Sequence, residues 1–139
     1  MSNEIDEVTL KRIQKEREEL LARQQKAPVY FLAAWKKAVA LAGEHLFTHH
    51  RDHPAPASVD QATDKWQLIP DYEVIKNYLK TASTGEALFI AVLYSFYNGD
   101  DGWEMYQDLG YRGLGDIAYR LEYEQLQIVT ELMRYHTGW

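Results

Sequence analysis

The sequence contains no cysteine and no long apolar run, and both absences narrow what the chain can do. Without cysteine, disulfide bonds and thiolate chemistry are excluded. The longest apolar run, residues 87–93, is far shorter than the roughly 20 residues needed to span a bilayer. Residues 1–10 carry acids where a secretory signal would be basic and then apolar. These features predict a soluble cytoplasmic protein without a membrane partner.

The motifs of common catalytic sites are also missing. No Gly-x-Ser-x-Gly elbow is present to expose a nucleophilic serine. The segment Gly110-x-x-Gly113-x-Gly115 lacks the preceding strand and the lysine of a phosphate-binding loop. We therefore expect a protein that is not an enzyme and holds no cofactor.

Basic residues are scarce in the last part of the chain. Residues 81–139 contain three arginines and nine acids, so their net charge of 3 − 9 = −6 equals that of the whole chain. The same segment holds eleven tyrosine, phenylalanine and tryptophan residues. A surface that mixes acids and aromatic rings suits a basic protein or nucleoprotein complex better than it suits nucleic acid. Direct binding of nucleic acid is therefore not expected.

Length and composition predict an all-α fold, a compact bundle of four to five helices with a charged N-terminal helical extension. We place the extension at residues 1–27 and a single helical domain at residues 28–139. Residues 3–26 are rich in helix-forming charged residues and contain no glycine or proline. Their apolar stripe is thin, which leaves two alternatives: a solvated helix, or a homodimer or other partner contact through residues 3–26.

Apolar spacing and helix-end signals predict four helices in the domain. They span residues 28–52, 70 or 71 to 81, 85–97 and about 114–136. Pro28 suits the first turn of a helix, and Ser83 with Glu86 has the spacing of a capping box. Residues 53–69 are interpreted as a loop, and residues 100–115 as a glycine-rich stretch of turns, with a short hairpin conceivable at 103–111.

Three histidines recur at a spacing of four residues: His45, His49 and His53. On a continuous helix their imidazoles would project from adjacent turns of one face and could hold zinc. Pro54 argues against this site because proline unwinds a helix before the third histidine completes the face. A solvated histidine cluster is the favoured interpretation, with metal binding as the alternative.

A docking surface is the stronger candidate. Tyrosine and tryptophan are good contact residues because they bury a large area with few rotors, and carboxylates around them would steer a basic partner. The predicted partner-binding residues are Asp100, Asp101, Trp103, Glu104, Tyr106 and Asp108, with Glu122 and Glu124 as lesser candidates.

Three pieces of sequence carry a resemblance over about residues 85–135. They are Ala91-Val-Leu-Tyr-Ser-Phe-Tyr-Asn-Gly, then Gly102-Trp-Glu-Met-Tyr-Gln-Asp-Leu, then the long terminal helix. Together they resemble small uncharacterised helical domains of phages and integrative elements. The pieces Tyr97-Asn-Gly and Trp103-Glu-Met-Tyr are also similar to plasmid antirestriction proteins. The resemblance brings no catalytic residues, and it implies a mobile element, where small acidic proteins often occlude host defence proteins.

The expected function is therefore that of a non-catalytic acidic binding protein that blocks or regulates a basic, nucleic-acid-processing partner. The setting implied by the resemblance is a mobile-element inhibitor of a host defence complex such as CRISPR or restriction. Two alternatives stay open: a metal-binding domain or metal-dependent enzyme that uses His45, His49 and His53, and an immunity or antitoxin-type protein.

Overall fold

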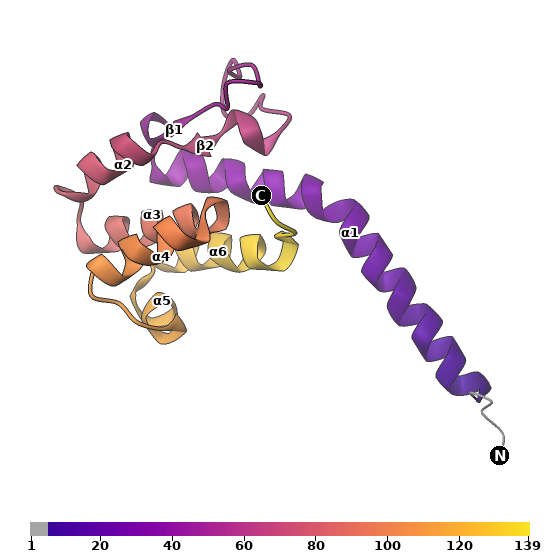
Figure 1. Ribbon diagram of the computed structural model, residues 1–139. Coiled ribbons are helices and arrows are strands. Elements are labelled where there is room, and N and C mark those ends of the chain that lie inside the picture. The colour runs from indigo at the N-terminus through magenta and orange to yellow at the C-terminus, as the bar shows by residue number, and fades with distance from the viewer. Residues whose placement is uncertain (1–5) are drawn as a thin grey trace.

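The computed structural model describes residues 6–139, and over these residues the fold is all-α, as predicted (Figure 1). The α-helices are α1 (Glu7–Ala42), α2 (Tyr72–Leu79), α3 (Thr84–Tyr97), α4 (Gly99–Asp108), α5 (Leu114–Arg120) and α6 (Tyr123–Tyr135). Two short strands, β1 (Phe47–Thr48) and β2 (Ile69–Pro70), pair antiparallel. The 3₁₀ turns η1 (Glu44–Leu46) and η2 (Lys65–Gln67) complete the described elements.

Helix α1 runs unbroken through Pro28, so the predicted helix boundary at this residue is wrong. Proline inside a helix removes the hydrogen bond to the carbonyl four residues earlier. Here that carbonyl belongs to Gln24, and both Gln24 and Pro28 are exposed, so water can solvate it. The helix therefore continues, and its axis bends near its middle (Figure 1).

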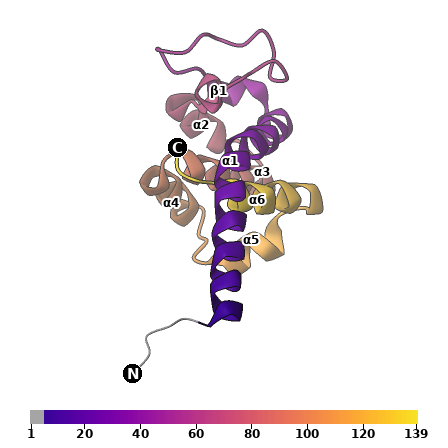
Figure 2. The same cartoon turned by 90° about the vertical axis from the view of Figure 1, so that its right-hand side faces the viewer.

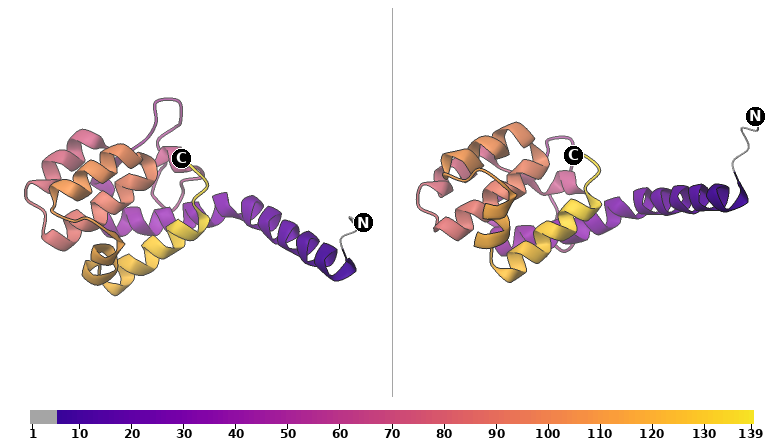
Figure 3. Two further views of the ribbon diagram at one scale, coloured as in Figure 1. Left: turned by 60° about the horizontal axis from the view of Figure 1, so that its bottom comes forward. Right: turned by 90° about the horizontal axis from the view of Figure 1, so that it is seen from below.

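The two halves of α1 have different surroundings. Ala27 is the first buried residue of the helix. The half before it projects away from the rest of the molecule, as Figures 2 and 3 show, and Arg23 near its end donates to the carbonyl of Arg134 in α6 (2.7 Å). Asp6 caps this free half by accepting a hydrogen bond from the backbone N–H of Thr9 (2.7 Å). Of the helix predicted at residues 3–26, residues 3–5 lie outside the described residues.

Helix α1 ends at Ala42, ten residues before the predicted end at residue 52. Gly43 adopts φ = 122°, a conformation that favours glycine, and its N–H bonds to the carbonyl of Val39. The chain then passes through η1, β1 and a long loop before η2 and β2. The prediction extended the helix to the histidines because their spacing continues that of the apolar stripe at 32–46. The positive φ of Gly43 ends the helix before them.

The predicted helices at 70 or 71 to 81 and at 85–97 are confirmed as α2 and α3 within a few residues. The side chains of Asp71 and Ser83 cap their N-termini. Glu86, the expected reciprocal member of the capping box, instead accepts a hydrogen bond from the Tyr78 hydroxyl (2.6 Å). This bond ties α3 back to α2.

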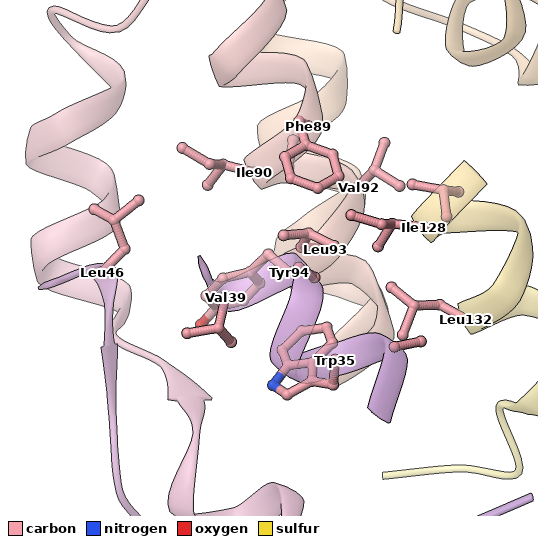
Figure 4. Close-up of a cluster of buried hydrophobic side chains, with 14 of the residues drawn as sticks. Trp35, Val39, Leu46, Phe89, Ile90, Val92, Leu93, Tyr94, Ile128 and Leu132 are labelled. Atoms are coloured by element: carbon pink, nitrogen blue, oxygen red, sulfur yellow. The ribbon is translucent and has the colours of Figure 1, made fainter. Parts of the chain in front are cut away.

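Helix α3 is the centre of the hydrophobic core. All eight residues from Ala87 to Tyr94 are buried. Figure 4 shows their side chains meeting Trp35 and Val39 of α1 and Ile128 and Leu132 of α6. Trp35 is fully buried and its indole N–H donates to the carbonyl of Leu68 (2.7 Å), which also fastens the β2 segment. A helix that is apolar nearly all round is expected to occupy this position.

The C-terminal part differs most from prediction. The stretch of turns at 100–115 is largely helix α4, and the predicted hairpin at 103–111 is absent from the described residues. The long helix predicted at 114–136 is two helices, because Leu121 and Glu122 adopt extended backbone between α5 and α6. After α6, Trp139 packs edge-on against Trp35 (4.8 Å between ring centroids).

Candidate functional site

The candidate surface is built on α4, which is fixed to α3 by one cap and one close contact. The side chain of Asn98 accepts a hydrogen bond from the backbone N–H of Asp101 (3.1 Å) and so starts α4 directly after α3. Gly102 then lies against the backbone of Ser95, where a Cβ would come within 2.4 Å of the Ser95 Cα. This glycine lets the two helices approach closely.

Three carboxylates form one line along the solvent side of α4. Asp100, Glu104 and Asp108 are four residues apart in turn and all exposed, so they share one face of the helix. We call them the acidic row. Asp101 is turned away from them, half-buried towards Tyr94. Burial first, and the carboxylate of Asp101 second, raise the pKa of Tyr94.

The charge of α4 is not compensated locally. Its ten residues contain four acids and no base, a net charge of −4, and no ion pair to these carboxylates occurs within residues 6–139. Like charges at i,i+4 repel each other by about 0.2–0.5 kcal/mol per pair. Asp108 also lies at the C-terminal end of α4, where the helix dipole disfavours a negative charge.

Beside the acidic row lies an apolar hollow between three helices, which we call the α4–α5 pocket. Its lining includes Ala91 of α3, Trp103 and Tyr106 of α4, and Leu114 and Ile117 of α5. Its volume is about 180 Å³ and its lining is almost entirely apolar. Trp103 is 49% exposed and Leu114 is 72% exposed, so two large apolar side chains stand at the rim.

Tyr106, one of the predicted partner-binding residues, is buried. Its ring stacks on Trp103 (5.3 Å between centroids), and its hydroxyl donates a hydrogen bond to the carbonyl of Gly113. Burial is also the main cause that raises the pKa of this hydroxyl. Tyr106 therefore supports the rim residue Trp103 and holds the turn before α5 in place.

The two lesser candidates lie apart from the acidic row, at the start of α6. Glu122 is the N-cap of α6 and forms a capping box with Gln125, whose side-chain oxygen accepts the backbone N–H of Glu122 (3.1 Å). Its role is thus at least partly structural. Glu124 is exposed in the first turn, where the helix dipole stabilises a carboxylate. Tyr123 between them is also exposed.

The histidines do not share a helical face, so the metal-site geometry predicted for His45, His49 and His53 is wrong. All three follow the end of α1. His45 packs against the ring of Tyr78, whereas His53 stacks on Trp66. The Nδ1–H of His49 donates to the carbonyl of His53 (2.9 Å). Among residues 6–139 no group of three or more potential ligands is close enough to hold a metal ion.

Sequence reasoning missed the α4–α5 pocket because it interpreted Gly102 and its neighbours as turns. The signal was present in the spacing of Gly102, Met105, Tyr106 and Leu109, which follows one face of a helix. Asn98 before two acids is also a typical helix start.

The comparisons with known proteins give this chain no relative. No family model, curated protein or solved structure matches it. A function is therefore inferred from the arrangement of the chain's own residues. None of the helices in residues 6–139 has both the length and the apolar character needed to cross a membrane.

Proposed function

We propose that this protein is a non-catalytic binding protein that docks its acidic helix α4 on a basic, nucleic-acid-processing partner and thereby blocks or regulates it. The observation that carries the proposal is the acidic row of Asp100, Glu104 and Asp108, exposed and without ion pairs, beside the exposed ring of Trp103. In this role the carboxylates occupy positions that nucleic-acid phosphates would take on the partner. With the resemblance to mobile-element domains, the partner we propose is a host defence complex such as CRISPR or restriction.

The energetics of α4 support a role in binding. Two like-charge pairs along the row, Asp100 with Glu104 and Glu104 with Asp108, cost roughly 0.4–1 kcal/mol of helix stability together. Arrangements that break a local rule without a compensating contact are expected at functional sites. A basic partner would supply the missing positive charge.

The acidic row also suits fast recognition. Exposed carboxylates contribute more to the rate and specificity of encounter than to the final affinity, and salt screens their effect over about 10 Å at 0.1 M. Trp103 would add an apolar contact, since tryptophan is prominent among residues that dominate binding energy. The row thus steers the partner and Trp103 anchors it.

The test is affinity capture from a lysate of the host, with retained proteins identified by mass spectrometry. The wild type is compared with Asp100→Asn/Glu104→Gln/Asp108→Asn, which removes three negative charges without changing the shape of α4. The matched control is Glu16→Gln/Glu18→Gln/Glu19→Gln, which makes the same change in charge on the exposed half of α1.

We expect the wild type and the control to retain a basic nucleic-acid-binding complex that the α4 variant loses. Added double-stranded DNA or guide RNA should compete for the same complex if carboxylates replace phosphates. Retention of one dedicated toxin instead would favour the immunity or antitoxin role. Equal capture by the α4 variant and the wild type would refute α4 as the docking surface.

A further inference from the structure

We infer that the α4–α5 pocket receives one apolar side chain of the partner, presented by a short segment in which lysine or arginine flanks it. The inference deepens the proposed function and rests on it for the identity of the surface. It adds the chemistry of the segment that is recognised: an apolar anchor such as leucine, methionine or phenylalanine, with at least two basic neighbours.

The size of the pocket selects a side chain over a metabolite. Sites for drug-sized small molecules occupy roughly 300–1,000 Å³ and contain a few convergent polar groups. The α4–α5 pocket has about 180 Å³ and an almost entirely apolar lining. The Tyr106 hydroxyl already donates its proton to the carbonyl of Gly113, so it does not donate to a polar ligand. What fits is an apolar group without hydrogen-bonding needs.

Two exposed apolar side chains of the pocket indicate that its occupant is a side chain of a protein. Trp103 of α4 and Leu114 of α5 both line the pocket and are both substantially exposed. Burying them with an inserted side chain removes apolar area from water on both surfaces, which contributes roughly 25 cal/mol per Å² before the costs of association.

The surrounding charge determines what should flank the anchor. Residues 99–119 contain five acids and one base, Arg112, a net charge of −4. Asp116 lies on the α5 side, and its carboxylate accepts the backbone N–H of Arg112 (3.1 Å). The acidic row lies on the α4 side, where Glu104 directly follows Trp103 in the sequence. A segment whose apolar residue enters between these carboxylates is stabilised by lysine or arginine on both sides.

The test is selection from a random library of 12-residue peptides on the immobilised wild-type protein. Trp103→Ala removes one wall of the pocket, and Leu114→Gln makes the other wall polar, both without changing the charge. The controls are Tyr119→Ala and Leu21→Gln, which alter an exposed aromatic and an exposed leucine outside the pocket. Far-UV circular dichroism verifies that each variant is folded.

We expect the enriched peptides to share one apolar residue flanked by lysine or arginine. The synthesised consensus peptide should bind Trp103→Ala and Leu114→Gln about tenfold more weakly than the wild type, and both controls as the wild type does. Replacing the apolar residue of the peptide by alanine should cause a similar loss. No enrichment, a consensus without basic residues, or equal binding to the pocket variants would overturn the inference. A consensus that reproduces a segment of this chain would also overturn it, in favour of a second copy as the occupant.

The two proposals fail in different ways. If Trp103→Ala and Leu114→Gln still capture the partner at wild-type level while neutralising the acidic row abolishes capture, the pocket inference and the anchoring role of Trp103 are wrong, and docking through the acidic row stands. If neutralising the acidic row leaves capture of the partner unchanged, the proposed function itself is wrong.

Discussion

Replacing Gly102 by alanine tests directly whether α4 is packed as closely on α3 as the structure shows. A Cβ at this position would lie 2.4 Å from the Ser95 Cα and 2.5 Å from its backbone nitrogen, where ordinary contact begins at 3.4 Å. The helices would have to separate by 3.4 − 2.4 = 1.0 Å, because backbone atoms cannot turn aside. Such a gap forfeits a quarter to a half of the dispersion energy of the contacts it opens.

We expect a net loss of about 2 kcal/mol in the free energy of unfolding for Gly102→Ala. Overpacking a core costs roughly 1–3 kcal/mol, and we take the upper value because the clash is with backbone. Alanine returns about 1 kcal/mol through its higher helix propensity. For a chain of this length the change corresponds to a decrease in melting temperature of roughly 6 °C.

Thermal unfolding followed by circular dichroism at 222 nm measures this difference. The matched control is Gly99→Ala, since a Cβ at Gly99 meets no atom within 4 Å. Its melting temperature should stay the same or rise. If Gly102→Ala is as stable as Gly99→Ala, α4 does not pack on Ser95 as described, and the geometry of the α4–α5 pocket fails with it.

Three further predictions concern the acidic row, His136 and the free half of α1. Glu104→Gln/Asp108→Asn should raise the free energy of unfolding by roughly 0.5–1 kcal/mol, because it relieves like-charge repulsion. Urea denaturation measures this change, and a lower free energy of unfolding in the variant would contradict the reasoning. Burial, assisted by Lys65, lowers the pKa of His136 below 6.5, so the unfolded chain binds more protons and stability should fall as pH drops below that value. In melting curves recorded at a series of pH values, His136→Asn should lose less stability than the wild type as the pH falls. If stability falls equally with pH in both proteins, other groups cause the loss. The two alternatives for residues 3–26, a solvated helix and a homodimer, differ in their use of the apolar stripe that includes Leu10 and Leu20, both exposed. A homodimer predicts that the wild type sediments as a dimer and Leu10→Glu/Leu20→Glu as a monomer, whereas a solvated helix predicts that both sediment as monomers.

The elements that sequence predicted well are those whose local signals agree with their packing. Residues 84–97 combine a serine cap with an apolar run, and α3 occupies the core over nearly the expected range. Asp71 provides a similar start for α2. In both cases propensity, capping and burial favour the same helix, so no distant contact was needed to locate it.

The failures arise where tertiary contacts override a local signal. Pro28 looks like a helix start, but the residues before it are good helix formers, and the missing hydrogen bond falls on the solvent side. Gly102 looks like a turn residue, whereas its lack of a side chain serves the contact with Ser95. A single sequence does not reveal which helix a glycine will pack against.

The candidate site was predicted in composition but not in shape. The acidic row and Trp103 are exposed on one helix, as a docking surface requires. Tyr106 is buried, and Asp101 is turned towards Tyr94. The pocket needs α5 opposite α4, and only the break at residues 121–122, which separates α5 from α6, produces that arrangement. Neither charge counts nor aromatic content contain this information.

The most direct test of the central claim is the salt dependence of binding between this protein and the partner it captures. The dissociation constant would be measured at 50 and 300 mM salt for the wild type and for Asp100→Asn/Glu104→Gln/Asp108→Asn. If the acidic row steers and holds a basic partner, wild-type affinity should fall about tenfold over this range, and the variant should bind weakly with little further loss. If wild type and variant bind equally and respond equally to salt, α4 is not the docking surface.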